Sequence, residues 1–120
     1  MLTLHLNSAY DVTDVPVKIG TYEGGQHQEV TVKMDFRIPA GFTRAMLHHQ
    51  TKENEAEFYE QLITDWRGVC DEHGEAIPCH GEIKKAVLKN ERVLYGVLQS
   101  MTSILLGVPL AKNSEAGSAS

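Results

Sequence analysis

The sequence lacks any long apolar run and any cluster of basic residues. Its longest apolar stretch, Ile104 to Leu110, is interrupted by Gly107 and Pro109 and is far shorter than the roughly 20 residues that a membrane-spanning helix needs. The longest basic run is the Lys84-Lys85 pair, in a chain whose formal net charge is −5. Proteins that bind nucleic acid concentrate positive charge on one face. We therefore expect neither a membrane nor a nucleic acid as a partner.

Cysteine is also scarce. Cys70 and Cys79 are the only two in the sequence, which is too few for a disulfide framework. At the N-terminus, Leu2, Leu4 and Leu6 alternate with polar residues, and no basic segment leads into an apolar run, so no signal peptide is expected. We expect a cytoplasmic protein in which both cysteines are reduced.

Alternation of apolar and polar residues is present throughout the first third of the chain. The longest alternating series of apolar residues is Val30, Val32, Met34, Phe36 and Ile38. Two shorter series are Val15, Val17 and Ile19, and Leu2, Leu4 and Leu6. A period of two predicts strands with one buried face. Gly24-Gly25 separates the two longer strands and provides the positive φ of a tight turn. We expect an antiparallel hairpin, with the N-terminal strand added at one edge.

Helical spacing replaces this alternation after Gly41. A short helix or helical turn is expected over Phe42 to Gln50, and a stronger helix from Glu53 to Gly68. The residues that share one face of the second helix are Ala56, Tyr59, Ile63 and Trp66. Glutamates in its first turns suit the helix dipole, and Gly68 is expected to end it.

Turn chemistry and two further helices follow. The segment Asp71 to Glu75 predicts a small loop or mini-hairpin between short apolar pieces. Gly81 to Lys89 is expected to form a short amphipathic helix with Ile83, Val87 and Leu88 inward. The last helix has the best pattern, and Asn90 and Glu91 suit its start while Pro109 stops it. Its apolar residues are Val93, Leu94, Val97, Leu98, Met101, Ile104, Leu105 and Val108.

These patterns together predict one α+β domain over residues 1–110. A small antiparallel sheet from the N-terminal third packs against three or four helices. The segment 111–120 is small and polar, and we expect a flexible, disordered tail there.

A chemical interpretation of the cysteines and histidines is possible but disfavoured. Cys70, His73, Cys79 and His80 are all side chains that bind zinc, and they lie within eleven residues. However, Cys79 and His80 are adjacent, and neighbouring residues rarely direct both side chains at one metal. We expect no metal, no cofactor and a turn that happens to contain these residues. His48-His49 has no nucleophile setting near it, so a pair of exposed histidines at a helix end is preferred to a general base.

Other residues are candidates for contact with a protein partner. Trp66 is expected in the core, with an interface anchor as the alternative. Tyr95, Leu106 and Leu110 lie off the main apolar face of the last helix or just beyond it. If the domain does not cover them, they offer a surface to a partner helix. The sequence therefore names Trp66, Tyr95, Leu106 and Leu110 as candidate partner-binding residues and no catalytic residue.

The order of features resembles the tail assembly chaperones of long-tailed siphophages and related prophages. The segments that carry the resemblance are Val15-Pro16-Val17-Lys18-Ile19, the strand Val30 to Ile38, Asp65-Trp66-Arg67-Gly68-Val69, the acidic-glycine turn with Ile77-Pro78, and Lys112-Asn113. The chain departs from the family pattern at His73, where an acidic residue is usual, and at Ala76, where proline is common. Cys79-His80 replaces an aromatic-serine pair.

The resemblance implies a non-catalytic assembly factor. Such chaperones bind the long helical tape measure protein in the host bacterial cytoplasm, recruit tail tube protein around it, and are absent from the mature virion. Self-association is a further expectation. The family often adds a second domain by ribosomal frameshifting, and Ala111-Lys112-Asn113 can be encoded as GCA-AAA-AAC, which contains the slippery heptamer A-AAA-AAC. Two alternatives stay open: a small structural tail or connector protein of the virion, and a metal-binding enzyme built on Cys70, His73, Cys79 and His80.

Overall fold

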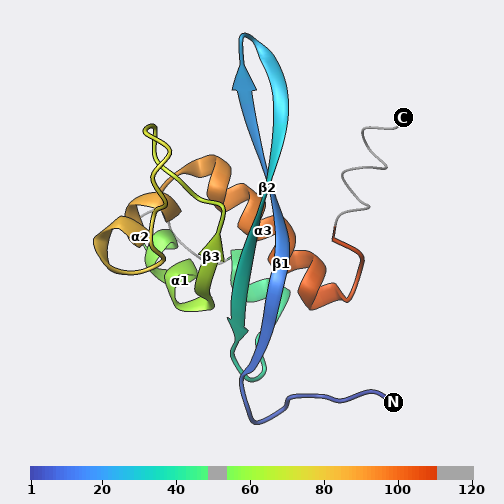
Figure 1. Cartoon of the computed structure of the whole chain (residues 1–120). Helices are drawn as coiled ribbons and strands as arrows, with labels where there is room; N and C mark the ends of the chain where they lie inside the picture. Colours follow the sequence, from blue (N-terminus) through green and yellow to red (C-terminus); the bar gives the residue numbers. More distant parts are fainter. Residues whose placement is uncertain (49–53, 111–120) are drawn as a thin grey trace.

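The computed structural model describes residues 1–48 and 54–110. It is an α+β fold in which a three-stranded antiparallel sheet, ordered β1-β2-β3, packs against helices (Figure 1). The expected fold class is therefore confirmed. The predicted tail at 111–120 and the end of the predicted helical segment at 49–50 lie outside the described residues. Within the described part, no helix is long and apolar enough to cross a membrane.

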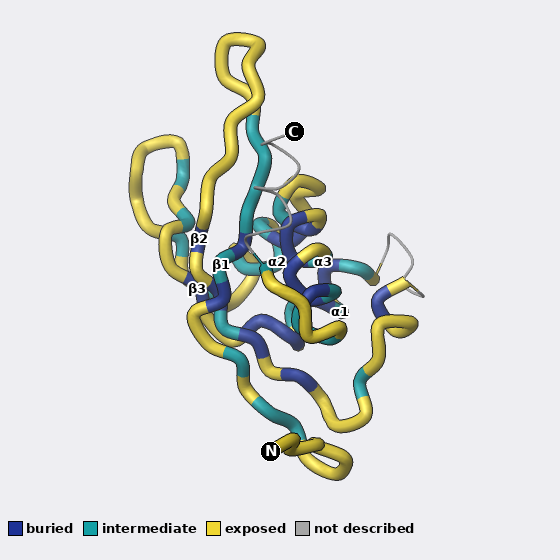
Figure 2. Tube along the Cα trace, turned by 90° about the vertical axis from the view of Figure 1, so that its right-hand side faces the viewer, coloured by how far each residue is buried: buried dark blue, intermediate teal, exposed yellow. Residues whose placement is uncertain are grey.

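The sheet is dominated by one long hairpin. Strand β1 (Tyr10–Glu23) pairs with β2 (Gln26–Ile38) from Tyr10↔Ile38 to Glu23↔Gln26. The turn between them is Gly24-Gly25, at φ 55° and 79°, which is the left-handed region that glycine enters without strain. The predicted hairpin and its turn are confirmed. Its far end projects beyond the rest of the molecule and is exposed (Figures 1 and 2).

The inner half of the hairpin forms one side of the core. Its apolar residues at alternate positions are buried, as a period of two requires: Val15, Val17, Val32, Met34, Phe36 and Ile38. The register shifts between Val12 and Val15, where Asp14 has φ 54°. This bulge gives the strand a local kink.

The predicted helix from Glu53 to Gly68 is wrong in its second half. Helix α1 (Glu55–Leu62) ends where β3 (Ile63–Arg67) begins, with no loop between them. Strand β3 pairs antiparallel with β2, and Trp66 lies opposite Met34. Helical spacing is satisfied by chance here, because pairing with a distant strand outweighs local pattern.

Lys84 stabilises this change from helix to strand. Its ammonium group donates hydrogen bonds to the carbonyl oxygens of Glu60, at 2.9 Å, and Ile63, at 2.5 Å. Carbonyl oxygens at a helix C-terminus have no backbone N–H of the same helix to bond them. Lys84 supplies this missing donor at the point where α1 changes directly into β3.

The N-terminal strand is a second incorrect expectation. Leu2, Leu4 and Leu6 belong to no strand and are 81%, 64% and 71% exposed. Within the described residues no strand pairs with this segment, so its alternation of apolar and polar residues does not produce a strand in the structure.

The turn and the last two helices match the sequence more closely. Cys70 pairs with Ala76 as an isolated bridge, which confirms the expected mini-hairpin. A short 3-10 helix, η1 (Arg44–His48), precedes α1. After the mini-hairpin, α2 spans Gly81–Leu88 and α3 spans Glu91–Leu106. Two details differ: Ile83 is exposed rather than inward, and α3 ends at Gly107, at φ 68°, before Pro109 is reached.

Candidate functional site

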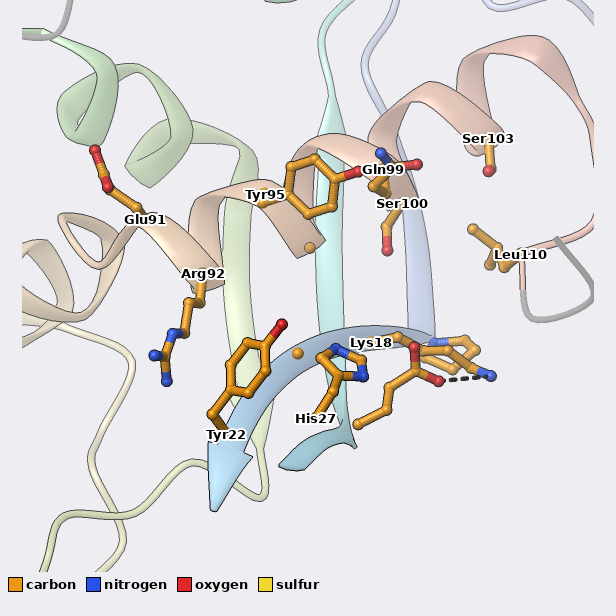
Figure 3. Close-up of a pocket in the computed structure, with 14 residues that line it drawn as sticks. Lys18, Tyr22, His27, Glu91, Arg92, Tyr95, Gln99, Ser100, Ser103 and Leu110 are labelled. Atoms are coloured by element: carbon orange, nitrogen blue, oxygen red, sulfur yellow. Dashed lines mark ion pairs between the residues drawn. The ribbon is translucent and has the colours of Figure 1, made fainter. Parts of the chain in front are cut away.

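An open groove of about 610 Å³ lies between α3 and the outer half of the hairpin (Figure 3). We call it the α3 groove. The hairpin contributes Pro16, Lys18, Gly20, Tyr22, His27 and Glu29, and the other wall consists of Glu91, Arg92, Tyr95, Gly96, Gln99, Ser100, Ser103 and Leu110.

Small residues of α3 allow the helix to lie close against β1. Gly96, Ser100 and Ser103 are buried and recur at helical spacing on one face. A Cβ on Gly96 would lie 2.6 Å from the carbonyl oxygen of Lys18. Any larger residue at position 96 would therefore push α3 away from β1 and change the shape of the groove.

Aromatic rings and a glycine form the hairpin side. His27 lies over Gly20, because a Cβ there would be 2.8 Å from the His27 Nε2 atom. The ring of Tyr22 meets the His27 ring edge to face, at a centroid separation of 5.3 Å. Tyr95 is on the opposite wall (Figure 3). Rings of this kind offer a partner apolar area and a polar edge at low entropic cost.

Charges in the groove are of both signs. The ammonium group of Lys18 forms an ion pair with Glu29, at 3.4 Å. Glu91 and Arg92 lie at the start of α3, near the mouth of the groove. Mixed charge does not select a single strongly charged ligand, and it suits a polypeptide surface that carries both apolar and polar groups.

The candidate partner residues divide into two groups. Tyr95 and Leu110 line the groove, and Leu106 is 50% exposed on the face of α3 that Tyr95 occupies. Trp66 is different: it is 5% exposed, and its indole Nε1 donates to the carbonyl oxygen of Ile77 at 2.7 Å. Trp66 is therefore a core residue, which is the placement preferred from the sequence, and its burial leaves little surface for the alternative role of an interface anchor.

The cysteines and histidines do not assemble into a site. In the ranges 1–48 and 54–110, no three His, Cys, Asp or Glu side chains are placed to hold a metal ion. Cys70, His73 and His80 are exposed. Cys79 is partly buried, and this burial raises the pKa of its thiol, which keeps it protonated and a poor nucleophile. His48 is also exposed, while His49 lies outside the described residues.

A charged cluster on the solvent-facing side of the sheet was not predicted from the sequence. The Arg67 guanidinium bonds Asp14 at 2.6 Å, Asp35 at 2.8 Å and Asp65 at 3.4 Å. Asp35 also accepts a hydrogen bond from the Asp14 backbone N–H, at 2.8 Å. These bonds hold the pKa of Asp35 below its usual value, with Arg67 as the main cause. The cluster joins β1, β2 and β3 beside the bulge.

The α3 groove offers a ligand aromatic rings, apolar surface and charges of both signs. Comparisons of the chain with family models, with curated proteins and with solved structures find no match.

Proposed function

We propose that this protein is a phage tail assembly chaperone that binds the tape measure protein and helps to recruit tail tube protein, without catalysis. The observation that carries the proposal is the α3 groove with the exposed apolar residues beside it, Tyr95 and Leu106. The order of sequence features that resembles this family supports it independently.

The physical demands of that task suit the groove. A tape measure protein is a long, largely helical chain with apolar stripes that self-associate when they are bare. Tyr95, Gln99 and Leu106 are exposed and follow one face of α3 at helical spacing. This face presents an apolar group at each end with a polar group between them, an arrangement that fits a second amphipathic helix. Many weak contacts along the rod would keep it covered and still let tube subunits displace them.

Co-expression with a tape measure protein tests this function. The wild-type chain is expected to make the tape measure soluble and to elute with it in many copies during size-exclusion chromatography. Leu106→Glu is expected to fold and to lose this co-elution, because a carboxylate replaces an exposed leucine of the binding face. Ile83→Glu is the matched control, since Ile83 is 44% exposed on α2 and away from the groove. A tape measure that stays insoluble beside the folded wild-type chain would contradict the proposal.

The projecting hairpin favours a second candidate function. A structural tail or connector protein uses such an arm to reach neighbouring subunits, and residues 22–31 are exposed in the described structure. Mass spectrometry of purified phage particles separates the two candidates. A chaperone is expected to be absent, whereas a connector protein would be present at a fixed number of copies per particle.

A further inference from the structure

The N-terminal leucines form an exposed apolar strip that has no partner surface in the described part of the chain. Leu2, Leu4 and Leu6 are absent from the core cluster and from the residues packed against it. The nearest ordered contact is a stack of the His5 ring on the Tyr10 ring, at 4.7 Å. An alternating Leu-x-Leu-x-Leu segment is a typical β-strand pattern, and water-exposed leucines at this density are costly unless something covers them.

A strand edge elsewhere in the molecule is open to pairing. Strand β1 is at the edge of the sheet. Pro16 has no N–H and lies opposite Lys33, so its nitrogen must face away from β2. The register from Pro16 to Glu23 is unbroken. The backbone N–H and C=O groups of Gly20 and Tyr22 therefore also face away from β2.

The inner part of this edge is protected against pairing, and the outer part is not. The bulge at Asp14 and the missing N–H of Pro16 interrupt the first half, as in other protected edges. At Lys18, Gly96 of α3 lies against the carbonyl oxygen. Beyond that point Gly20 and Tyr22 line the α3 groove (Figure 3), and among the described residues no strand pairs with the side of β1 that faces away from β2.

We propose that Leu2 to Leu6 of one copy add as a strand to Gly20–Tyr22 of a second copy, within its α3 groove. Backbone hydrogen bonds along the open edge would hold the strand, and the leucines on the groove side would pack against Tyr22 and Tyr95. The segment of the same chain is less suited to this place. It leaves β1 at Tyr10, so folding back would set it beside the bulge and Pro16 rather than beside Gly20.

This contact is head-to-tail, because the donor and acceptor surfaces are different. Such contacts give rings or filaments rather than closed dimers with twofold symmetry. Tyr95 belongs to this surface and to the proposed tape measure surface, so the two partners are expected to compete. The test below uses the protein alone, and its result is independent of whether a tape measure protein binds.

Sedimentation velocity of the full chain over a concentration series tests the proposal. The donor variant carries Leu2→Asp, Leu4→Asp and Leu6→Asp. The acceptor variant is Gly20→Pro, which removes the outward N–H, and Tyr22→Asp is a second acceptor variant should Gly20→Pro fail to fold. Ile83→Asp is the control, since it removes an exposed apolar residue outside both surfaces.

The wild type and Ile83→Asp are expected to associate progressively as concentration rises, while each donor or acceptor variant alone stays a monomer. An equimolar mixture of the donor and acceptor variants keeps one intact contact, so it should give a 1:1 complex and nothing larger. A wild type that is monomeric at every concentration would overturn the proposal. So would a folded donor variant that associates like the wild type, or a mixture that gives no complex.

Discussion

Replacement of Gly96 by alanine tests how closely α3 lies against β1. The added Cβ would be 2.6 Å from the Lys18 carbonyl oxygen, 3.2 Å from Ile19 Cγ1 and 3.3 Å from Val17 Cγ1. The first distance is below any that real Cβ atoms adopt, and the obstructing atom belongs to the backbone. Helix α3 must therefore move outward by several tenths of an ångström.

Two effects of this substitution oppose each other. Alanine is a better helix former than glycine by about 1 kcal/mol, while inserting a methyl group into a tightly packed contact costs about 1–3 kcal/mol. The outward shift of α3 also loosens the packing of Val97 and Met101, both fully buried, and so adds to the cost. We expect the packing cost to exceed the helix gain, with a net loss of about 2 kcal/mol in the free energy of unfolding.

Urea denaturation followed by Trp66 fluorescence measures this loss, because the single tryptophan is buried in the folded state. Gln99→Ala is the control: it lies exposed on the same helix and should change the free energy of unfolding by no more than about 0.5 kcal/mol. A Gly96→Ala variant as stable as the wild type, or more stable, would refute the close approach of α3 to β1.

Three further predictions concern stability. Because Arg67 lowers the pKa of Asp35 in the folded state, the free energy of unfolding of the wild type should fall as the pH falls below about 4. Urea titrations should show a smaller fall over the same pH range for Asp35→Asn. Burial raises the pKa of Tyr59 to about 12 in the folded state, above the unfolded value of about 10, so the free energy of unfolding should fall as the pH rises between these values. Tyr59→Phe should remove that loss, and an equal loss in the variant would contradict the role of Tyr59. Lys84→Met removes two hydrogen bonds from a charged donor and should cost about 1–3 kcal/mol in thermal unfolding. Lys85→Met is the control: the ion pair of Lys85 with the exposed Glu82 is 4.0 Å long, so its loss should cost at most about 0.5 kcal/mol. Equal losses in the two variants would refute the stabilising role of Lys84 at the end of α1.

Local pattern was sufficient for the elements that form mainly from neighbouring residues. The hairpin followed from period-two alternation and Gly24-Gly25. Helix α3 followed from its spacing and from Asn90, whose side chain accepts hydrogen bonds from Arg92 and Val93 N–H groups. In both cases the pattern and the tertiary contacts favour the same structure.

The incorrect expectations depend on contacts between distant residues. Residues Ile63 to Arg67 satisfied helical spacing, yet they pair with β2 some 30 positions earlier in the chain. The alternation of Leu2, Leu4 and Leu6 predicted a strand for which the chain provides no partner edge. Local sequence reports whether a segment can form a strand, but not whether a partner strand is available.

The candidate site was only partly accessible from sequence. Tyr95, Leu106 and Leu110 were selected because they lie off the main apolar stripe, and the structure leaves each at least partly exposed. Trp66 was included as the alternative to a core placement, because it is the single tryptophan and lies on the predicted apolar helix face. The groove itself was missed, since it depends on the twist of the hairpin and on Gly96. Gly96, a glycine in the middle of a strong helix pattern, is the sequence signal that could have indicated a close approach of this helix to a neighbouring strand.

The most direct test of the proposed function is hydrogen–deuterium exchange of the chain in complex with a tape measure protein, compared with the free chain. If α3 carries the binding face, exchange should be slower in peptides that cover Glu91–Leu106 and unchanged in peptides that cover Val69–Ile77. Protection of Val69–Ile77 with unchanged exchange in α3 would contradict it.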